Sequence, residues 1–166
     1  MSGHLYLAYG SNLHPLRLTR RLPKARLIGV TALERHRISY GKVGSDRSGK
    51  CTIHAVDDEQ VYGALYQVSA LCRRRLDIIE GGYRRIEVKI DLAGKPERAF
   101  TYVALPSKTN EAMRPFAWYR DLVIAGARFH GFPESYLEAL AAIETIPDPD
   151  SKRRISNGRL AAELGP

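Results

Sequence analysis

Apolar residues in the first two thirds of the chain occur in short runs or at alternate positions, a pattern typical of strands. The alternation is clearest in residues 85–90, where Ile86, Val88 and Ile90 share one face and charged residues occupy the other. Polar residues 57–60 separate two apolar runs and predict a hairpin. We expect strands at residues 5–9, one or two within 25–40, and at 52–56, 61–68, 85–90 and 98–105.

Helical signals are interleaved with these strands. We expect a short helix at residues 16–22, opened by a proline in its first turn. Ser69 is a good N-cap for a helix over residues 70–80, which the glycine pair 81–82 ends. Residues 41–50 are rich in glycine, serine and charge, and they predict an exposed loop.

The last third of the chain has a helical pattern up to residue 147. A helix over residues 115–128 would place Trp118, Leu122 and Ala125 on one stripe. A last helix is expected to begin at residues 132–134, with Tyr136, Leu137, Leu140 and Ile143 facing the core. The remaining tail is polar, and the pattern leaves its order and its role open.

The order of these elements favours a particular fold class. Strand runs separated by short turns favour antiparallel or mixed pairing over a doubly wound parallel sheet. A length of 166 residues is typical of one domain and is sufficient to bury a core without disulfides. We therefore expect an α+β fold, with one domain over residues 1–147 and a C-terminal tail over 148–166.

The composition is ordinary for a globular protein, with 44% apolar and 27% charged residues, but the formal net charge is +8. We find no apolar run long enough to span a membrane and no signal-peptide pattern. The basic residues are scattered, apart from short clusters at 73–75, 84–85 and 152–154. We therefore favour a solvated basic face over a nucleic-acid site, although the charge also permits steering of an anionic small molecule.

Cysteine and histidine provide little chemistry. Cys51 and Cys72 are too few for a disulfide framework and lack metal-ligand spacing, which favours a reducing, cytoplasmic location. The five histidines lie far apart in the sequence. We therefore expect neither a metal nor an organic cofactor.

The segment Tyr9-Gly10-Ser11-Asn12-Leu13 carries the strongest chemical signal, and it follows the first expected strand. A strand that breaks into Gly-Ser-Asn leaves successive backbone N–H groups free beside two small polar side chains. Such a turn can hold an anion or a developing oxyanion. The same residue types also suit an ordinary strand-to-helix turn, so the segment alone leaves both interpretations open.

Glu80 is the second informative residue, because it lies at the expected end of a helix. Unpaired carbonyl groups there disfavour another negative charge. The helical period places Glu80 near Leu76, at the border of an apolar stripe. If its side chain points inward, burial raises its pKa and it can act as a general base near neutral pH. Arg73 would oppose that shift if it came within reach, and an exposed, ion-paired Glu80 is the alternative.

Three segments together resemble the γ-glutamylcyclotransferase family, over a similarity that extends from about residue 5 to 143. The first is the turn at residues 9–13. The second comprises residues 61–66 and 76–81, and the third residues 119–127 and 131–136. The turn alone is moderately specific, whereas the three segments in this order are specific for the superfamily.

This resemblance implies a small mixed, mainly antiparallel β-barrel flanked by helices, and it assigns candidate roles. The family's general acid/base matches Glu80. Residues after Glu80 form a more compact connection than in the animal enzymes, which leaves substrate choice open. Tyr102 is either a core residue or a pocket wall. The candidate substrate-binding residues are Tyr9, Gly10, Ser11, Asn12, Leu13, Tyr83 and Tyr119.

The resemblance also implies a reaction: conversion of a γ-glutamyl amide or peptide to 5-oxoproline and a free amine, without a cofactor, within glutathione metabolism. The expected partner is a small γ-glutamyl substrate, with no membrane involved, and the chain is either a monomer or a homodimer. One alternative is a sister activity on γ-glutamylamines. The other is a non-catalytic protein that binds an acidic metabolite or nucleic acid.

Overall fold

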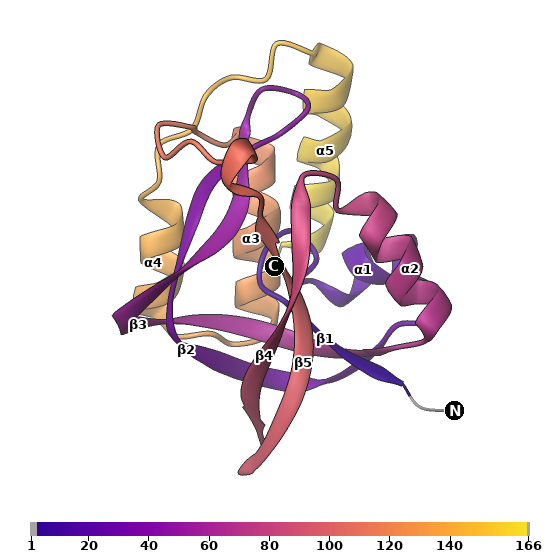
Figure 1. The fold of residues 1–166 in the computed structure, drawn as a ribbon. Coiled ribbons are helices and arrows are strands. Elements are labelled where there is room, and N and C mark those ends of the chain that lie inside the picture. The colour runs from indigo at the N-terminus through magenta and orange to yellow at the C-terminus, as the bar shows by residue number, and fades with distance from the viewer. Residues whose placement is uncertain (1–2, 166) are drawn as a thin grey trace.

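One five-stranded sheet forms the centre of the protein, and helices cover it (Figure 1). The computed structural model describes residues 3–165. The strand order across the sheet is β2-β3-β1-β5-β4. The strands are β1 (His4–Ala8), β2 (Arg26–Val43), β3 (Gly49–Val68), β4 (Tyr83–Leu92) and β5 (Lys95–Ala104).

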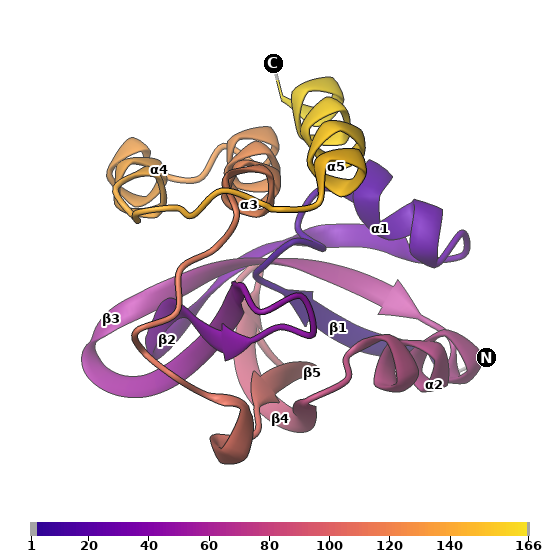
Figure 2. The ribbon, with the colours of Figure 1, turned by 90° about the horizontal axis from the view of Figure 1, so that it is seen from above.

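The helices lie in two places relative to the sheet (Figure 2). Helices α3, α4 and α5 lie side by side over one face, with α1 next to α5, while α2 lies beside β1. Within the described residues, no helix is long and apolar enough to cross a membrane. The helices are α1 (Pro15–Arg21), α2 (Ala70–Ile79), the short 3-10 helix η1 (Pro106–Lys108), α3 (Ala117–Phe129), α4 (Glu134–Ala141) and α5 (Ser151–Leu164).

The mixed, mainly antiparallel α+β architecture is confirmed. All strand pairs are antiparallel except β1 and β5, which pair in parallel at Tyr6 and Phe100. The sheet is not closed into a barrel, because β2 and β4 are its two edges. These edges meet through a side chain instead: the Thr31 hydroxyl donates a hydrogen bond to the Asp91 carbonyl oxygen at 2.7 Å. "Barrel" is therefore only a loose description of this sheet.

The first hairpin lies at a different place from the one predicted. Segment 57–60 is not a turn, because β3 continues through it. Gln60 pairs with Glu34, and residues 56–59 form a bulge opposite Arg35, whose φ of 59° lets β2 bend there. The hairpin turn lies instead within residues 44–48, where the Gly44 N–H donates to the Ser48 carbonyl oxygen at 2.8 Å. The loop predicted at 41–50 is therefore present but limited to residues 44–48, because β2 and β3 continue into the segment, and it is less exposed than predicted, since Lys42 and Ser48 are buried.

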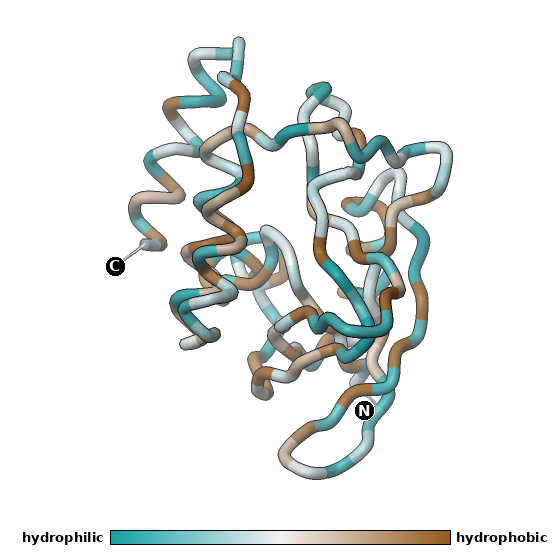
Figure 3. Tube along the Cα trace, turned by 90° about the vertical axis from the view of Figure 1, so that its left-hand side faces the viewer, coloured by the Kyte–Doolittle hydropathy of each residue, from teal (hydrophilic) through white to brown (hydrophobic). Residues whose placement is uncertain are grey.

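Helix α2 and strands β4 and β5 follow the sequence signals closely. The Ser69 hydroxyl oxygen accepts a hydrogen bond from the Cys72 N–H at 3.2 Å, as expected of an N-cap. Gly82 has a φ of 83°, which suits the turn that leads into β4. Polar and apolar residues are interleaved along strands and helices alike (Figure 3), so each element has a side for the core.

The C-terminal region contains three helices rather than two. Leu137 and Leu140 of α4 are buried as expected, but Ile143 lies beyond the helix and is 37% exposed, so its predicted place in the core was wrong. The polar tail forms α5, which packs against α3 and buries Ala161 and Leu164. The end of the predicted tail, residue 166, lies outside the described residues.

Asp148 anchors α5 to the rest of the protein. Its side chain is 1% exposed and accepts hydrogen bonds from the Trp118 indole at 2.9 Å and from the Arg153 guanidinium at 2.8 and 2.5 Å. These bonds hold the pKa of Asp148 well below its usual range, with the Arg153 contact the largest cause. One carboxylate therefore joins α3 to the first turn of α5.

We expect Asp148→Ala to destabilise the protein by about 1–3 kcal/mol, because the Trp118 and Arg153 donors lose a charged partner. The measurement is the free energy of unfolding in urea. The control is Asp57→Ala, which removes an exposed ion pair with Arg35 and should change stability by less than about 0.5 kcal/mol. Equal stability of the two variants would contradict the anchoring role.

Candidate active site

The turn after β1 presents free donors, as its sequence predicts. The Leu13 N–H donates to the Gly10 carbonyl oxygen at 3.0 Å and closes the turn. The N–H groups of Gly10, Ser11 and Asn12 donate to no partner within residues 3–165. Glycine suits the start of the turn because a Cβ at Gly10 would lie 3.0 Å from the Cβ of Cys51 on β3, a tight contact.

Glu80 faces this turn from the end of α2. Its backbone N–H caps the helix by donating to the Leu76 carbonyl oxygen at 2.8 Å. Its side chain is partly buried, and Oε1 accepts a hydrogen bond from Nδ2 of Asn12 at 3.1 Å. The glycine pair that follows ends the helix and turns the backbone away. The Glu80 carboxylate points toward the turn after β1.

Asn12 connects three side chains through its one amide. Nδ2 donates to Glu80 and also to the Tyr6 hydroxyl oxygen at 3.1 Å. Oδ1 accepts a hydrogen bond from Nη1 of Arg21 at 3.1 Å. The side chain is buried, and its donors and acceptor are all used. Both the orientation of Asn12 and the position of the Glu80 carboxylate are therefore fixed.

A wall of tyrosines completes a small cavity of about 40 Å³ in front of Glu80. Backbone contacts fix the rings: Tyr9 donates to the Tyr102 carbonyl oxygen at 2.5 Å, and Tyr83 donates to the Cys51 carbonyl oxygen at 2.7 Å. The Tyr119 hydroxyl oxygen accepts from the Cys51 N–H at 3.1 Å. The cavity is lined by Tyr6, Tyr9, Gly10, Ser11, Asn12, Glu80, Tyr83, Tyr102 and Tyr119.

The structure therefore brings together all but one of the candidate residues. Leu13 is the exception, because it is fully buried beneath the turn and lines no part of the cavity. A Cβ at Gly126 would lie 2.4 Å from the Cβ of Leu13, so α3 packs directly on this residue. Its carbonyl oxygen accepts a hydrogen bond from the Tyr66 hydroxyl at 2.7 Å. Leu13 holds the turn in place, and its predicted position beside the substrate is corrected.

Burial raises the pKa of Glu80 above its ordinary value, and nearby groups limit that rise. The Arg21 charge opposes it most, followed by the Asn12 hydrogen bond and the Lys42 charge. Arg73, which the sequence suggested for this role, lies instead beside His4 at 3.1 Å. Glu80 therefore combines burial with cationic neighbours, a combination that suits a group that both takes and gives a proton.

Sequence reasoning missed the basic residues near Glu80 and missed Tyr6 as a pocket wall, whereas it left Tyr102 open between core and wall. Tyr102 is both a core residue and a wall, being 4% exposed and in contact with the cavity. Arg21 and Lys42 come from α1 and β2, far from Glu80 in sequence, so no local pattern marks them. Within residues 3–165, no three His, Cys, Asp or Glu side chains gather closely enough to hold a metal ion.

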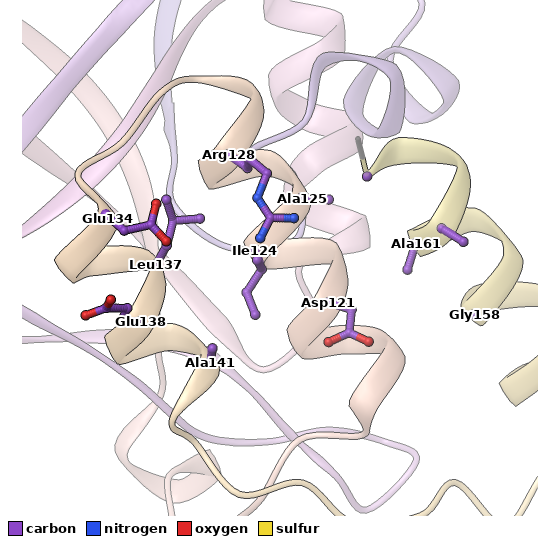
Figure 4. A pocket seen from close by; sticks show the side chains of 12 residues that line it. Asp121, Ile124, Ala125, Arg128, Glu134, Leu137, Glu138, Ala141, Gly158 and Ala161 are labelled. Atoms are coloured by element: carbon purple, nitrogen blue, oxygen red, sulfur yellow. The ribbon is translucent and has the colours of Figure 1, made fainter.

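A separate groove lies between α3, α4 and α5 and has a volume of about 420 Å³ (Figure 4). Its floor includes Ile124 and Leu137, and Asp121 and Arg128 are among its charged residues. It contains none of the candidate residues, and its charged side chains do not surround a buried carboxylate. The smaller cavity is the candidate active site, because Glu80, the turn with free N–H groups and five tyrosines line it together.

Fold and site together define a small α+β protein with a partly buried carboxylate beside a turn of free N–H donors. A sequence profile of the AIG2-like family matches residues 60–140. Human gamma-glutamylcyclotransferase is 30% identical over 149 residues, which cover 84% of this chain and 78% of the human protein. The mouse protein of the same name is also 30% identical, over 151 residues with the same coverage.

A solved structure titled "Gamma-glutamyl cyclotransferase" has the same fold, with a TM-score of 0.85 and 26% sequence identity. The match covers 98% of this chain and 99% of that structure. The chain therefore belongs to the γ-glutamylcyclotransferase family, and it is an enzyme of this type.

The raised pKa of Glu80 predicts a pH-dependent effect of Glu80→Gln on stability. Between the ordinary carboxyl pKa of 4.5 and its raised value, the folded protein binds more protons than the unfolded chain. Wild-type stability therefore falls as pH rises through this window, because a charge must form in the cavity. Glu80→Gln avoids this loss, so it should gain stability relative to the wild type across the window and stay level above it.

The measurement is the urea unfolding free energy of both proteins from pH 4 to pH 8. Glu87→Gln on the exposed face of β4 is the matched control, since it removes the same charge outside the cavity. A stability difference between wild type and Glu80→Gln that stays constant with pH would contradict the buried carboxylate. The same trend in the control would also contradict it.

Proposed function

We propose that this enzyme cyclises a γ-glutamyl amide to 5-oxoproline and releases the free amine, with Glu80 as general acid and base. The observation that carries the proposal is the contact between the Glu80 carboxylate and Asn12 of the donor-rich turn. The contact supports the proposal, because Glu80 and the donor-rich turn line the same small cavity. Family membership supports the type of reaction, while the residue roles rest on this geometry.

The chemistry needs no nucleophile from the protein. The substrate's neutral α-amino nitrogen attacks its own γ-carbonyl carbon, and the new C–N bond closes a five-membered ring. Glu80 takes a proton from the attacking nitrogen and returns it to the departing amide nitrogen as the old C–N bond breaks. Such proton transfer typically contributes about 10²–10⁴-fold in rate. Holding the glutamyl chain folded makes the attack intramolecular and supplies much of the remaining acceleration.

The free N–H groups at Gly10, Ser11 and Asn12 bind one of two negative groups. They stabilise either the oxyanion of the tetrahedral intermediate or the α-carboxylate of the substrate. Both placements leave Glu80 within the same cavity. Tyr9, Tyr83 and Tyr119 surround the bound group and exclude water, since a backbone partner already holds each of their hydroxyls.

Several wider roles belong to the same proposal. The sister activity on γ-glutamylamines shares every chemical step and differs in the amine released. A place in glutathione metabolism and a cytoplasmic location are proposed with it, and free thiols at Cys51 and Cys72 support a reducing compartment. The partner is a small γ-glutamyl molecule. A purely binding protein is not favoured, because the relatives are named as enzymes.

We expect Glu80→Gln to lower kcat by at least about 10²-fold while the fold is kept, because an amide cannot exchange the proton. The measurement is 5-oxoproline release from γ-glutamyl-alanine at saturating substrate. Ser11→Ala should lose less, since its backbone N–H remains. The control Glu87→Gln should keep wild-type turnover. Near-wild-type turnover in Glu80→Gln would remove this carboxylate from the mechanism.

A further inference from the structure

A larger, strongly basic cavity lies directly outside Glu80. It has a volume of about 660 Å³ and shares Ser11, Glu80, Tyr83 and Tyr119 with the inner cavity, so the two are continuous. We call it the vestibule. Five cationic side chains line it: Arg17, Arg21, Lys42, Lys50 and Lys108. Two acidic residues line it as well, namely Asp46 and Glu80.

Most of these cations lack an acidic partner. Lys50 forms an ion pair with Asp46 at 2.8 Å, so each of these two charges has a partner. Within residues 3–165, Arg17, Lys42 and Lys108 form no ion pair. A cluster of unpaired positive charge beside a reaction site is costly to keep, and a bound anion would offset that cost.

Lys42 is the clearest case. Only 8% of the residue is exposed, and Nζ has no hydrogen-bond partner among the described residues; it lies 4.9 Å from the centre of the Tyr83 ring. Burial lowers the pKa of Lys42, while the Glu80 charge opposes that shift. Arg17 is similar, since its Nε is buried without a partner and burial lowers its pKa to about 10. Both groups are placed to receive an anion that the protein itself does not supply.

Gly82 brings a second lysine beside Lys42. A Cβ at Gly82 would lie 3.4 Å from Nζ of Lys42 and 3.5 Å from Cγ of Lys108, so both side chains pass over this glycine. Gly82 also has a φ of 83°, which a larger residue would adopt only with strain. Gly82, two residues after Glu80, therefore leaves room for the side chains of Lys42 and Lys108.

The side chains that line the vestibule carry more positive than negative charge. Five cations against two carboxylates leave an excess of three positive charges in the vestibule. The γ-glutamyl group brings one carboxylate and one α-amino group, which is protonated in the free substrate, so its net charge is near zero. The inner cavity of about 40 Å³ admits only a small group, so the leaving portion lies in the vestibule. A leaving α-amino acid brings one carboxylate there, and a further negative charge on it would offset more of the remaining positive charge.

We infer that the vestibule binds a leaving amine with two negative charges, so that the preferred substrates are γ-glutamyl derivatives of aspartate or glutamate. Lys42 and Lys108 bind the side-chain carboxylate of the leaving residue. The same cations repel a lysine side chain or a polyamine, which disfavours γ-glutamylamines as substrates. This inference rests on the proposed cyclisation and adds its specificity.

The experiment compares γ-glutamyl-glutamate with γ-glutamyl-glutamine, which has nearly the same shape and one charge less. We expect kcat/KM for 5-oxoproline release to be at least about tenfold higher for the glutamate derivative, with the preference weakening at high salt. γ-Glutamyl-putrescine should be the poorest of the three. Lys108→Met, at an exposed position, should move the ratio of kcat/KM for γ-glutamyl-glutamate to kcat/KM for γ-glutamyl-glutamine toward one.

Lys89→Met, an exposed lysine of β4 outside the vestibule, is the matched control and should keep the wild-type ratio. Equal kcat/KM for the two isosteric substrates, or a ratio unchanged in Lys108→Met, would overturn the inference while leaving the cyclisation intact. If no substrate releases 5-oxoproline, the proposed function fails instead. In that case, calorimetry measures the affinity of the Glu80→Gln protein for each of the two dipeptides. Equal affinities would overturn the inference.

Discussion

The hydrogen bond between Asn12 and Glu80 is the contact on which the site depends. It joins the turn after the first strand to the end of a helix that lies 68 residues later in the chain. Arg21 and Tyr6 use the remaining polar atoms of the Asn12 amide, so this amide cannot rotate without losing partners. Glu80 is therefore held in a partly buried place where its charge is disfavoured by burial and favoured by Arg21 and Lys42.

The sheet order explains why so many elements meet at one turn. Strand β1 is central, between β3 and β5, so the end of β1 is surrounded on both sides. Strand β3 supplies Cys51, whose backbone groups fix Tyr83 and Tyr119 from β4 and α3. Strand β5 supplies Tyr102, which accepts from Tyr9 through its carbonyl oxygen. The Glu80 carboxylate, at the C-cap of α2, reaches this point through a short helix that a glycine pair ends.

Local signals in the sequence predicted much of the fold and the centre of the site. The Ser69 cap, the glycine pair after Glu80 and the alternation in β4 are encoded by neighbouring residues, and the structure has them. The hairpin turn predicted at the acidic segment 57–60 was wrong, because exposed charged residues on a bulged strand have the same composition as a turn. Helix α5 depends on Asp148 and on small residues packed against α3, which give little periodic signal. The basic vestibule arises from distant segments, so only the folded chain assembles it.

The central claim is that Glu80 and the N–H groups of the first turn act on the same bound group. A crystal structure with 5-oxoproline tests this most directly. The account predicts that the product lies in the tyrosine-lined cavity, with an oxygen on the N–H groups of residues 10–12 and its ring nitrogen within hydrogen-bond reach of the Glu80 carboxylate. Product bound in the groove between α3, α4 and α5, or in the vestibule away from Glu80, would contradict it.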